Sequence, residues 1–210
     1  MSEMKRALIS VYEKEGIVEF AKELVGLKWR IISTGGTAKV LKEAGIKVTP
    51  IEKITGNPEC FDGRMKTISF QIEAGILYDR RNKKHREEFK ELKKIYGLVP
   101  IDMVVCNLYP FPKIVQNPNA TLEEAIEMID IGGPTMIRAA AKNFKNVIVV
   151  VDPKDYKEVI KELKENKNKI SFKTRIILAF KAFKLTALYD TAIQEYFSEC
   201  IFDKFWLIQN

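Results

Sequence analysis

The sequence predicts an α/β fold of three layers, in which a mostly parallel sheet is flanked by helices and a helical segment follows at the C-terminal end. Short apolar runs alternate with segments whose apolar residues recur at helical spacing, in the order strand, helix, strand, helix, strand over the first fifty residues. This order is typical of parallel sheets with right-handed crossovers. With 210 residues, of which 46% are hydrophobic, the chain can bury a sizeable core.

The N-terminal elements follow directly from this alternation. The predicted strands and helices of this part cover residues 7–11, 17–25, 30–33, 38–44 and 46–48. Gly45 ends the second of these helices. Residues 50–100 are less regular, and a charged helix is predicted over 83–96.

The second half continues the sheet with two apolar runs, which predict strands at 101–106 and 147–151. The helices of this half are predicted over residues 121–133, 134–142, 153–166 and 171–200. Thr121 and Glu124 form a capping box that opens the first of them, and Pro134 suits the first position of the second. We expect one domain over 1–200 and an apolar tail over 201–210 that packs on the body or on a partner chain.

Composition excludes several classes of protein. No run approaches about 18 consecutive apolar residues, so no transmembrane helix is predicted, and the N-terminus does not resemble a signal peptide. Cys60, Cys106 and Cys200 are few and far apart, which argues against a disulfide framework or a zinc site and suits the reducing cytoplasm. The formal net charge is +7, but basic residues are mixed with acidic ones, so nucleic-acid binding is not predicted.

A loop with two glycines follows the second predicted strand and precedes a helix, at 33–37. Ligands of parallel sheets bind at the carboxyl ends of the strands. Glycines let the backbone approach an anion, and hydroxyls and a helix N-terminus supply donors, so the loop predicts a phosphate site. A tight turn alone would also explain the glycine pair. Lys14, beyond the first strand, could reach the same anion or could be a solvated lysine at a helix start.

Two further segments carry polar side chains of interest. Arg64 and Lys66 flank Met65, and residues two apart in an extended stretch point the same way, so both cations can face one site. An ordinary exposed loop is the alternative. Asn107 and Tyr109 follow a strand and offer an amide and a phenol, although Tyr109 could also serve packing.

Asp130 is the most specific candidate, because it lies between Ile129 and Ile131 and just before a glycine pair. A solvent-facing loop has little reason to place isoleucines there. Lys142, twelve residues further on, ends a helix that is too apolar to be a free surface, so its side chain is predicted to contact another group. The alternative for Lys142 is charge complementarity at a helix C-terminus.

Together, five segments resemble the IMP cyclohydrolases, the N-terminal half of bifunctional purine biosynthesis proteins whose other half is an AICAR formyltransferase. The resemblance covers about residues 5–197. The segments, in the order and spacing of the family, are Ser33–Lys39, Asp62–Thr67, Cys106–Phe111, Ile129–Thr135 and Arg138–Asn143. Because the chain ends at Asn210 without the segment that opens the formyltransferase half, we expect a stand-alone cyclohydrolase or a fragment, with a separate formyltransferase as a possible partner.

The resemblance implies a methylglyoxal-synthase-like fold, usually dimeric, that converts FAICAR (5-formamidoimidazole-4-carboxamide ribonucleotide) to IMP with loss of water, without metal or cofactor. By resemblance, the residues that would hold the nucleotide, mainly its phosphate, are Ser10, Lys14, Thr34, Gly35, Gly36, Thr37, Arg64 and Thr67. The residues that would line the base are Cys106, Asn107 and Ile131. The residues that would carry the chemistry are Lys66, Tyr109, Asp130 and Lys142.

The chemistry of ring closure is compatible with these residue types. The carboxamide nitrogen must attack the formyl carbon, and the formyl oxygen must leave as water. Amide nitrogen is a poor nucleophile, so orientation is expected to supply on the order of 7 kcal/mol or more. Lys66 is the candidate cation at the formyl oxygen, Asp130 and Lys142 are expected to pair and deprotonate the amide, and Tyr109 would donate to the site. The roles of the two lysines could be exchanged.

The sequence departs from the family where histidines are usual, after the Lys-Thr pair and in the last long helix. Residues 68–73 and 184–187 contain none, and the single histidine, His85, lies in a charged helix. Histidine is therefore not the expected acid or base. A methylglyoxal-synthase-type phosphate lyase would need such a histidine. The other alternative is a regulatory nucleotide-binding module, like that of carbamoyl phosphate synthetase, which needs the phosphate loop but not the charged residues beyond it.

Overall fold

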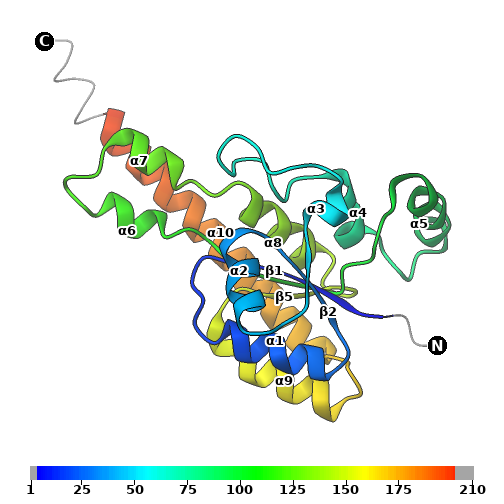
Figure 1. Cartoon of the computed structure of the whole chain (residues 1–210). Coiled ribbons are helices and arrows are strands. Elements are labelled where there is room, and N and C mark those ends of the chain that lie inside the picture. Colours follow the sequence, from blue (N-terminus) through cyan, green and yellow to red (C-terminus); the bar gives the residue numbers. More distant parts are fainter. Residues whose placement is uncertain (1–3, 202–210) are drawn as a thin grey trace, which may run out of the picture.

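A computed structural model describes residues 4–201 and contains one sheet of five parallel strands in the order β3-β2-β1-β4-β5 (Figure 1). The strands are β1 (Arg6–Val11), β2 (Arg30–Ser33), β3 (Val48–Pro50), β4 (Met103–Asn107) and β5 (Ile148–Val150). Each neighbouring pair is parallel. The predicted α/β fold with a parallel sheet flanked by helices is therefore confirmed.

Strand β1 is the centre of the sheet, because it pairs with β2 on one side and β4 on the other. Ala7, Leu8 and Ile9 are fully buried, as expected for a parallel strand covered on both faces. The register places Ile9 beside Ser33 of β2 and Val11 beside Asn107 of β4. The carboxyl ends of these three strands therefore lie along the same edge of the sheet.

Helices cover both faces of this sheet (Figure 1). They are α1 (Ile17–Gly26), α2 (Gly35–Glu43), α3 (Glu52–Thr55), α4 (Phe70–Leu77), α5 (Lys83–Tyr96), α6 (Phe111–Val115), α7 (Leu122–Glu127), α8 (Gly132–Lys142), the 3-10 helix η1 (Pro153–Asp155), α9 (Tyr156–Glu165) and α10 (Phe172–Glu199). α1 packs on α2 and α9, whereas α8 packs on α4, β4, β5 and α10. None of the helices within residues 4–201 is both long enough and apolar enough to cross a membrane.

Element boundaries differ from the sequence prediction at the segment that contains the predicted site acid. The helix expected to run to residue 133 ends at Glu127, and α8 begins at Gly132 instead of Pro134. The reason is local, because the Asp130 side chain accepts a hydrogen bond from the Gly133 backbone N–H and so starts the next helix early. The short helices α3, α4 and α6 were not predicted, and the predicted tail over 201–210 lies outside the described residues except for Ile201.

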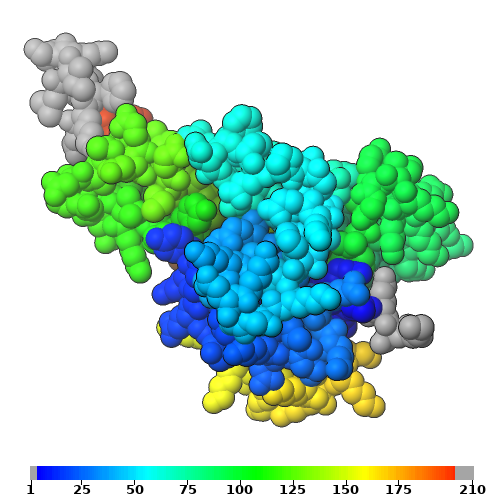
Figure 2. Space-filling view, in the orientation of Figure 1, coloured from blue at the N-terminus to red at the C-terminus, as the bar shows by residue number. Residues whose placement is uncertain are grey.

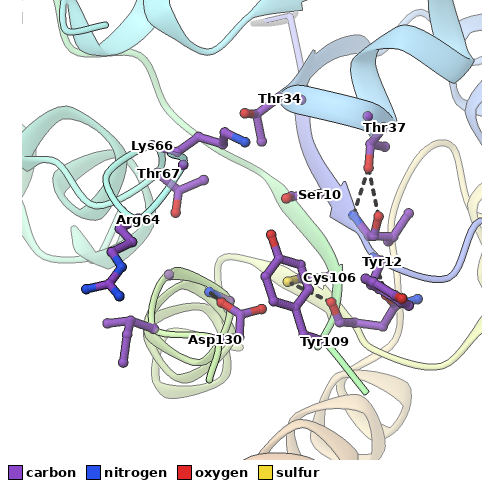
Figure 3. Close-up of a pocket in the computed structure, with 18 of the residues that line it drawn as sticks. Ser10, Tyr12, Thr34, Thr37, Arg64, Lys66, Thr67, Cys106, Tyr109 and Asp130 are labelled. Carbon is purple, nitrogen blue, oxygen red and sulfur yellow. Dashed lines mark hydrogen bonds between the residues drawn. The ribbon is translucent and has the colours of Figure 1, made fainter. Parts of the chain in front are cut away.

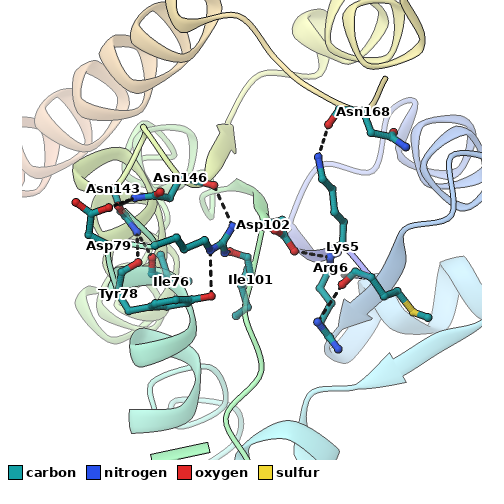
Figure 4. Close-up of polar contacts among 12 residues, drawn as sticks. Lys5, Arg6, Ile76, Tyr78, Asp79, Ile101, Asp102, Asn143, Asn146 and Asn168 are labelled. Carbon is teal, nitrogen blue, oxygen red and sulfur yellow. Dashed lines mark hydrogen bonds and ion pairs between the residues drawn. The ribbon is translucent and has the colours of Figure 1, made fainter. Parts of the chain in front are cut away.

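A cluster of polar side chains lies at the opposite edge of the sheet, where the strands begin (Figure 4). The Asp102 carboxylate accepts hydrogen bonds from the Arg6 backbone N–H and from Arg80, both at 2.8 Å. Arg80 also donates to the carbonyls of Ile101 and Asn146. These bonds tie the segment between α4 and α5 to β1 and β4, at the end of the sheet away from the site.

Glu73, in the first turn of α4, makes the stability of the fold depend on pH. Its side chain is half-buried, burial raises its pKa to about 7, and its Oε1 has no hydrogen-bond partner among residues 4–201. The folded chain therefore binds more protons than the unfolded chain between about pH 4.5 and pH 7. The free energy of unfolding therefore falls as the pH rises through this window, because burial disfavours the charged form of Glu73 in the folded chain.

We predict that Glu73→Gln raises the free energy of unfolding at pH 8 by on the order of 1 kcal/mol and raises it less at pH 5. Urea denaturation at the two pH values measures this difference. Glu91→Gln on the exposed face of α5 is the control and should show no such pH dependence. An equal gain for Glu73→Gln at both pH values would contradict the prediction.

Candidate active site

A cavity of about 620 Å³ opens at the carboxyl edge of the sheet. Its size is within the usual range of small-molecule sites. Its walls come from the ends of β1 and β4, the start of α2, the loop before α4 and the segment between α7 and α8 (Figure 3). Figure 2 shows the surface hollowed where the blue, cyan and green parts of the chain meet. Fourteen of the fifteen residues that the sequence assigns to a site line this cavity, and Lys142 is the exception.

The first turn of α2 forms one end of the cavity. Thr34 is the N-cap residue, and the backbone N–H groups of a first turn have no partner within their own helix. Thr34 is only 4% exposed, and its Oγ1 has no hydrogen-bond partner in the described chain. Gly35 has a φ of +50°, a conformation that favours glycine. An anion at this helix N-terminus would satisfy both the amides and the Thr34 hydroxyl.

Two lysines bring positive charge to this end. The Lys14 ammonium donates to the carbonyls of Val11 at 3.1 Å and Tyr12 at 2.8 Å, beside Gly36. The Lys66 ammonium forms an ion pair with Glu59 at 2.8 Å. It also lies so close to α2 that a Cβ atom added to Gly35 would meet it at 2.9 Å. The helix N-terminus and these cations favour the binding of a phosphate.

Arg64, the third cation at the cavity, is tied across its mouth to Glu127 of α7 by an ion pair. Both side chains are more than half exposed, so the pair adds little stability. Ser10, at the end of β1, also lines the cavity, and Thr67 is buried beside Gly132. These placements bring together the residues predicted to hold a nucleotide.

The side chains of Thr37 and Asn107 are already engaged in holding the walls. The Thr37 hydroxyl accepts from the Val11 N–H at 3.1 Å and donates to the Val11 carbonyl at 2.9 Å. The Asn107 amide accepts from the backbone N–H groups of Tyr12 and Glu13 and donates to the Glu13 carbonyl. Both residues line the cavity, but their polar atoms position β1 and the loop after it.

Asp130 lies at the other end of the cavity, with Tyr109 beside it (Figure 3). Burial raises the pKa of Asp130, and hydrogen bonds from the backbone N–H groups of Gly133 and Tyr109 act in the opposite direction. Its Oδ1 is 2.7 Å from the Gly133 nitrogen. Cys106 is buried next to it, and burial, followed by the Asp130 charge, raises the pKa of its thiol, which therefore stays neutral. Ile131 is exposed at the rim.

Lys142 does not line this cavity. It ends α8, whereas the cavity lies at the start of that helix, about 15 Å away along the axis at 1.5 Å per residue. Its side chain is exposed. The expected pair of Asp130 and Lys142 is therefore not formed within one chain, because nine residues of helix lie between Gly132 and Lys142.

Sequence reasoning did not identify Glu127 and Met128, which line the cavity, or Glu59, which pairs with the lining residue Lys66. Glu59 and Glu127 neutralise two of the cations, and Tyr12 packs edge-on against the Tyr109 ring at 5.5 Å. Met128 lines the cavity just before Asp130, so its place in the sequence could have indicated it. No local pattern identifies the two glutamates, since their roles depend on how the loops fold.

The double hydrogen bond of Thr37 can be tested without a ligand. Thr37→Val would leave the buried N–H and carbonyl of Val11 without this partner, which costs about 1 to 3 kcal/mol of unfolding free energy. Thr37→Ser keeps the hydroxyl and should lose less. Urea denaturation compares the two variants, and equal losses would show that the hydroxyl is not what matters.

The chain is similar to known proteins over nearly its whole length. Residues 16–135 match the MGS-like domain, and residues 140–207 match the AICARFT/IMPCHase bienzyme. The bifunctional purine biosynthesis protein PurH of Acetivibrio thermocellus is 54% identical over 198 residues, which are 94% of this chain and 38% of that protein. The PurH protein of Ruminiclostridium cellulolyticum is 53% identical over 200 residues, or 95% of this chain and 38% of that protein.

A solved structure agrees with these sequence matches. The crystal structure of ForH is 35% identical with a TM-score of 0.79, over 92% of this chain and 97% of that one. The chain spans less than two fifths of the length of the PurH proteins that it matches. The chain therefore belongs to the MGS-like domain family and is similar to the N-terminal, IMP cyclohydrolase part of the bifunctional purine biosynthesis proteins.

Proposed function

We propose that the chain is an IMP cyclohydrolase, which closes the second ring of FAICAR to give IMP and water. One observation carries this proposal: a single cavity joins the start of α2, where a helix N-terminus and two lysines favour an anion, to a partly buried carboxylate, Asp130, at its other end. A ribonucleotide has a phosphate at one end and its reacting groups at the other, so it fits both ends at once. The similarity to PurH proteins supports the same activity.

The phosphate end would hold the substrate and supply much of the orientation that ring closure needs. The unpartnered Thr34 hydroxyl and the amides of the α2 first turn would bind phosphate oxygens. Lys14 lies beside the same turn and would add charge. Because this end is rigidly attached to β1 and β2, the imidazole ring would be directed toward Asp130.

Asp130 would accept a proton from the carboxamide nitrogen as that nitrogen attacks the formyl carbon. Burial raises its pKa, which makes it a stronger base than an exposed aspartate. The new C–N bond converts the formyl oxygen into a hydroxyl group. The oxygen takes up one proton to become this hydroxyl and a second proton to leave as water. The lone pair of the former formamido nitrogen then forms the ring C=N bond, and that nitrogen loses its proton, so the two protons lost from nitrogen balance the two gained by oxygen.

Lys66 would stabilise the negative charge that develops on the formyl oxygen and would give the leaving water its proton. In the unliganded chain it is paired with Glu59 and lies against Gly35, so it would have to leave Glu59 to reach the formyl group. The Tyr109 hydroxyl points into the cavity and would donate to the same region (Figure 3). The assignment of the proton donor remains a prediction.

The experiment that tests the function is an absorbance assay of the purified chain with FAICAR. IMP formation would support the cyclohydrolase. Tight binding of IMP without turnover would favour the regulatory nucleotide-binding module instead. The phosphate lyase is disfavoured because His85, the single histidine, lies on α5 and does not line the cavity.

Asp130→Asn tests the proposed base. We predict that kcat for FAICAR falls by about a hundredfold or more, since general base catalysis contributes about that much. The Kd for IMP should stay within about threefold, because the phosphate end is unchanged. A variant that cyclises FAICAR at the rate of the parent chain would show that Asp130 is not the base.

The homodimer also remains a proposal, and α10 supports it. Phe172, Ile176, Phe180 and Phe183 are between 40% and 66% exposed, and their spacing places them on one side of the helix. The opposite side, which includes Leu178, packs on the body. Large exposed apolar patches usually mark protein interfaces. If Lys142 takes part in the chemistry, a second copy would have to supply it, because the chain's own Lys142 lies at the far end of α8.

Phe180→Lys places a charge in this apolar face, at the most exposed of its phenylalanines. We predict that the parent chain has the mass of two chains in light scattering and that Phe180→Lys has the mass of one. The control is Lys90→Glu, at an exposed position of α5 and not on this helix, which should remain dimeric. A parent chain that is monomeric at tens of micromolar would end the proposal.

The cellular location and a second protein partner are further parts of this proposal. The free state of Cys60, Cys106 and Cys200 is what a reducing cytoplasm would produce, and the cytoplasm remains the predicted location. In PurH proteins the matched region is part of a longer bifunctional chain. We infer that an AICAR formyltransferase, fused or separate, supplies FAICAR to this site.

A further inference from the structure

Tyr189 of α10 connects the Asp130 end of the cavity to the long C-terminal helix. Its hydroxyl donates to the Met128 carbonyl at 2.9 Å and accepts from the Asp130 backbone N–H at 2.9 Å. Tyr189 is only 5% exposed. The segment from Met128 to Ile131 lies between α7 and α8 and belongs to neither. A single distant side chain therefore holds the backbone on which Asp130 is carried.

The Asp130 side chain is held from other directions. Backbone N–H groups of Gly133 and Tyr109 both bond to its carboxylate. The carboxylate lies close against the start of α8, since a Cβ added to Gly133 would lie 2.5 Å from Asp130 Oδ2. The orientation of the carboxylate thus depends on the position of its own backbone relative to these two amides.

The ring of Tyr189 contacts the second of these segments. It meets the Phe111 ring edge-on at 6.2 Å, and Phe111 follows Tyr109 by two residues at the start of α6. Phe111 itself is fully buried. Tyr189 therefore contacts both chain segments that converge on Asp130, one through its hydroxyl and the other through its ring.

The hydroxyl keeps its proton over the working pH range. Burial is the main cause that raises the pKa of Tyr189 to about 12, and the charge of Asp130 acts in the same direction. The donation to Met128 and the acceptance from Asp130 are thus both available at neutral pH. One neutral phenol satisfies a carbonyl and an amide that would otherwise be unpaired.

We propose that Tyr189 is a positioning residue that fixes the Asp130 carboxylate against the reacting carboxamide, an inference that rests on the proposed cyclohydrolase function. Ring closure joins two groups of one substrate, so its rate depends steeply on how the base is placed. Without the hydroxyl, the Met128–Ile131 segment would turn toward solvent to hydrate its free N–H and carbonyl. Asp130 would then become more hydrated, and its raised pKa would fall toward the ordinary value.

Tyr189→Phe removes the hydroxyl and keeps the ring. We expect kcat for FAICAR cyclisation to fall by about tenfold or more, as in other cases of a misplaced catalytic group. KM for FAICAR and Kd for IMP should stay within about twofold, because the α2 end is untouched. The acid limb of the pH profile of kcat should move to lower pH, which a loss of stability alone would not cause.

Tyr196→Phe is the matched control. Tyr196 lies two turns further along α10 and also packs edge-on against Phe111, at 5.7 Å. Among the residues described, its hydroxyl bonds to neither Met128 nor Asp130. This variant should keep the parent kcat and pH profile. Circular dichroism first establishes that both variants are folded.

A second measurement separates this inference from the proposed function. The pKa of Asp130 can be followed by NMR of carboxyl-labelled aspartate in the parent chain and in both variants, with no substrate present. A lower Asp130 pKa in Tyr189→Phe alone supports positioning, even if the parent chain fails to cyclise FAICAR. An unchanged Asp130 pKa, or an unchanged kcat and pH profile in an active chain, would overturn it.

Discussion

The parallel pairing of β1 with β2 and β4 is the constraint on which the site depends. It brings the ends of three strands that are far apart in the sequence to one edge, where Val11 lies beside Asn107 and Ile9 beside Ser33. Every loop that carries a candidate residue leaves the sheet at this edge or packs against it. Because side chains of β1 are buried on both faces, a shift of register would move the whole cavity wall with it.

The polar residues at this edge divide into those already satisfied and those left for a ligand. The side chains of Thr37 and Asn107 form hydrogen bonds with the backbone of Val11, Tyr12 and Glu13, and these bonds hold the loop after β1 in place. Thr34, in contrast, keeps a buried hydroxyl without a partner in the described chain. A buried polar group without a partner costs stability. An anion bound at the start of α2 would give this hydroxyl a hydrogen-bond partner.

The sequence predicts the scaffold better than the chemistry. Apolar runs and glycine pairs identify the strands and the loops at their ends, because these depend on local pattern and on the general geometry of parallel sheets. Within one chain Lys142 lies far from Asp130, because neighbours in a motif can lie at opposite ends of a helix. Glu59 and Tyr189 reach the site only through tertiary packing, and nothing in their local sequence indicates this. The order of motifs along the chain identifies a family, but it does not give the distances between site residues in the folded structure.

Neighbouring carboxylates neutralise two of the three cations described at the cavity. Lys66 is paired with Glu59 and Arg64 with Glu127, while Lys14 is bound to backbone carbonyls. A dianionic phosphate that takes over these cations must release carboxylates, and both glutamates lie where water can hydrate them once released. Asp130 is different, since it is partly buried and has amides but no cation as its described hydrogen-bond partners. This distribution of charge supports the proposal that the α2 end binds a phosphate and that Asp130 accepts a proton.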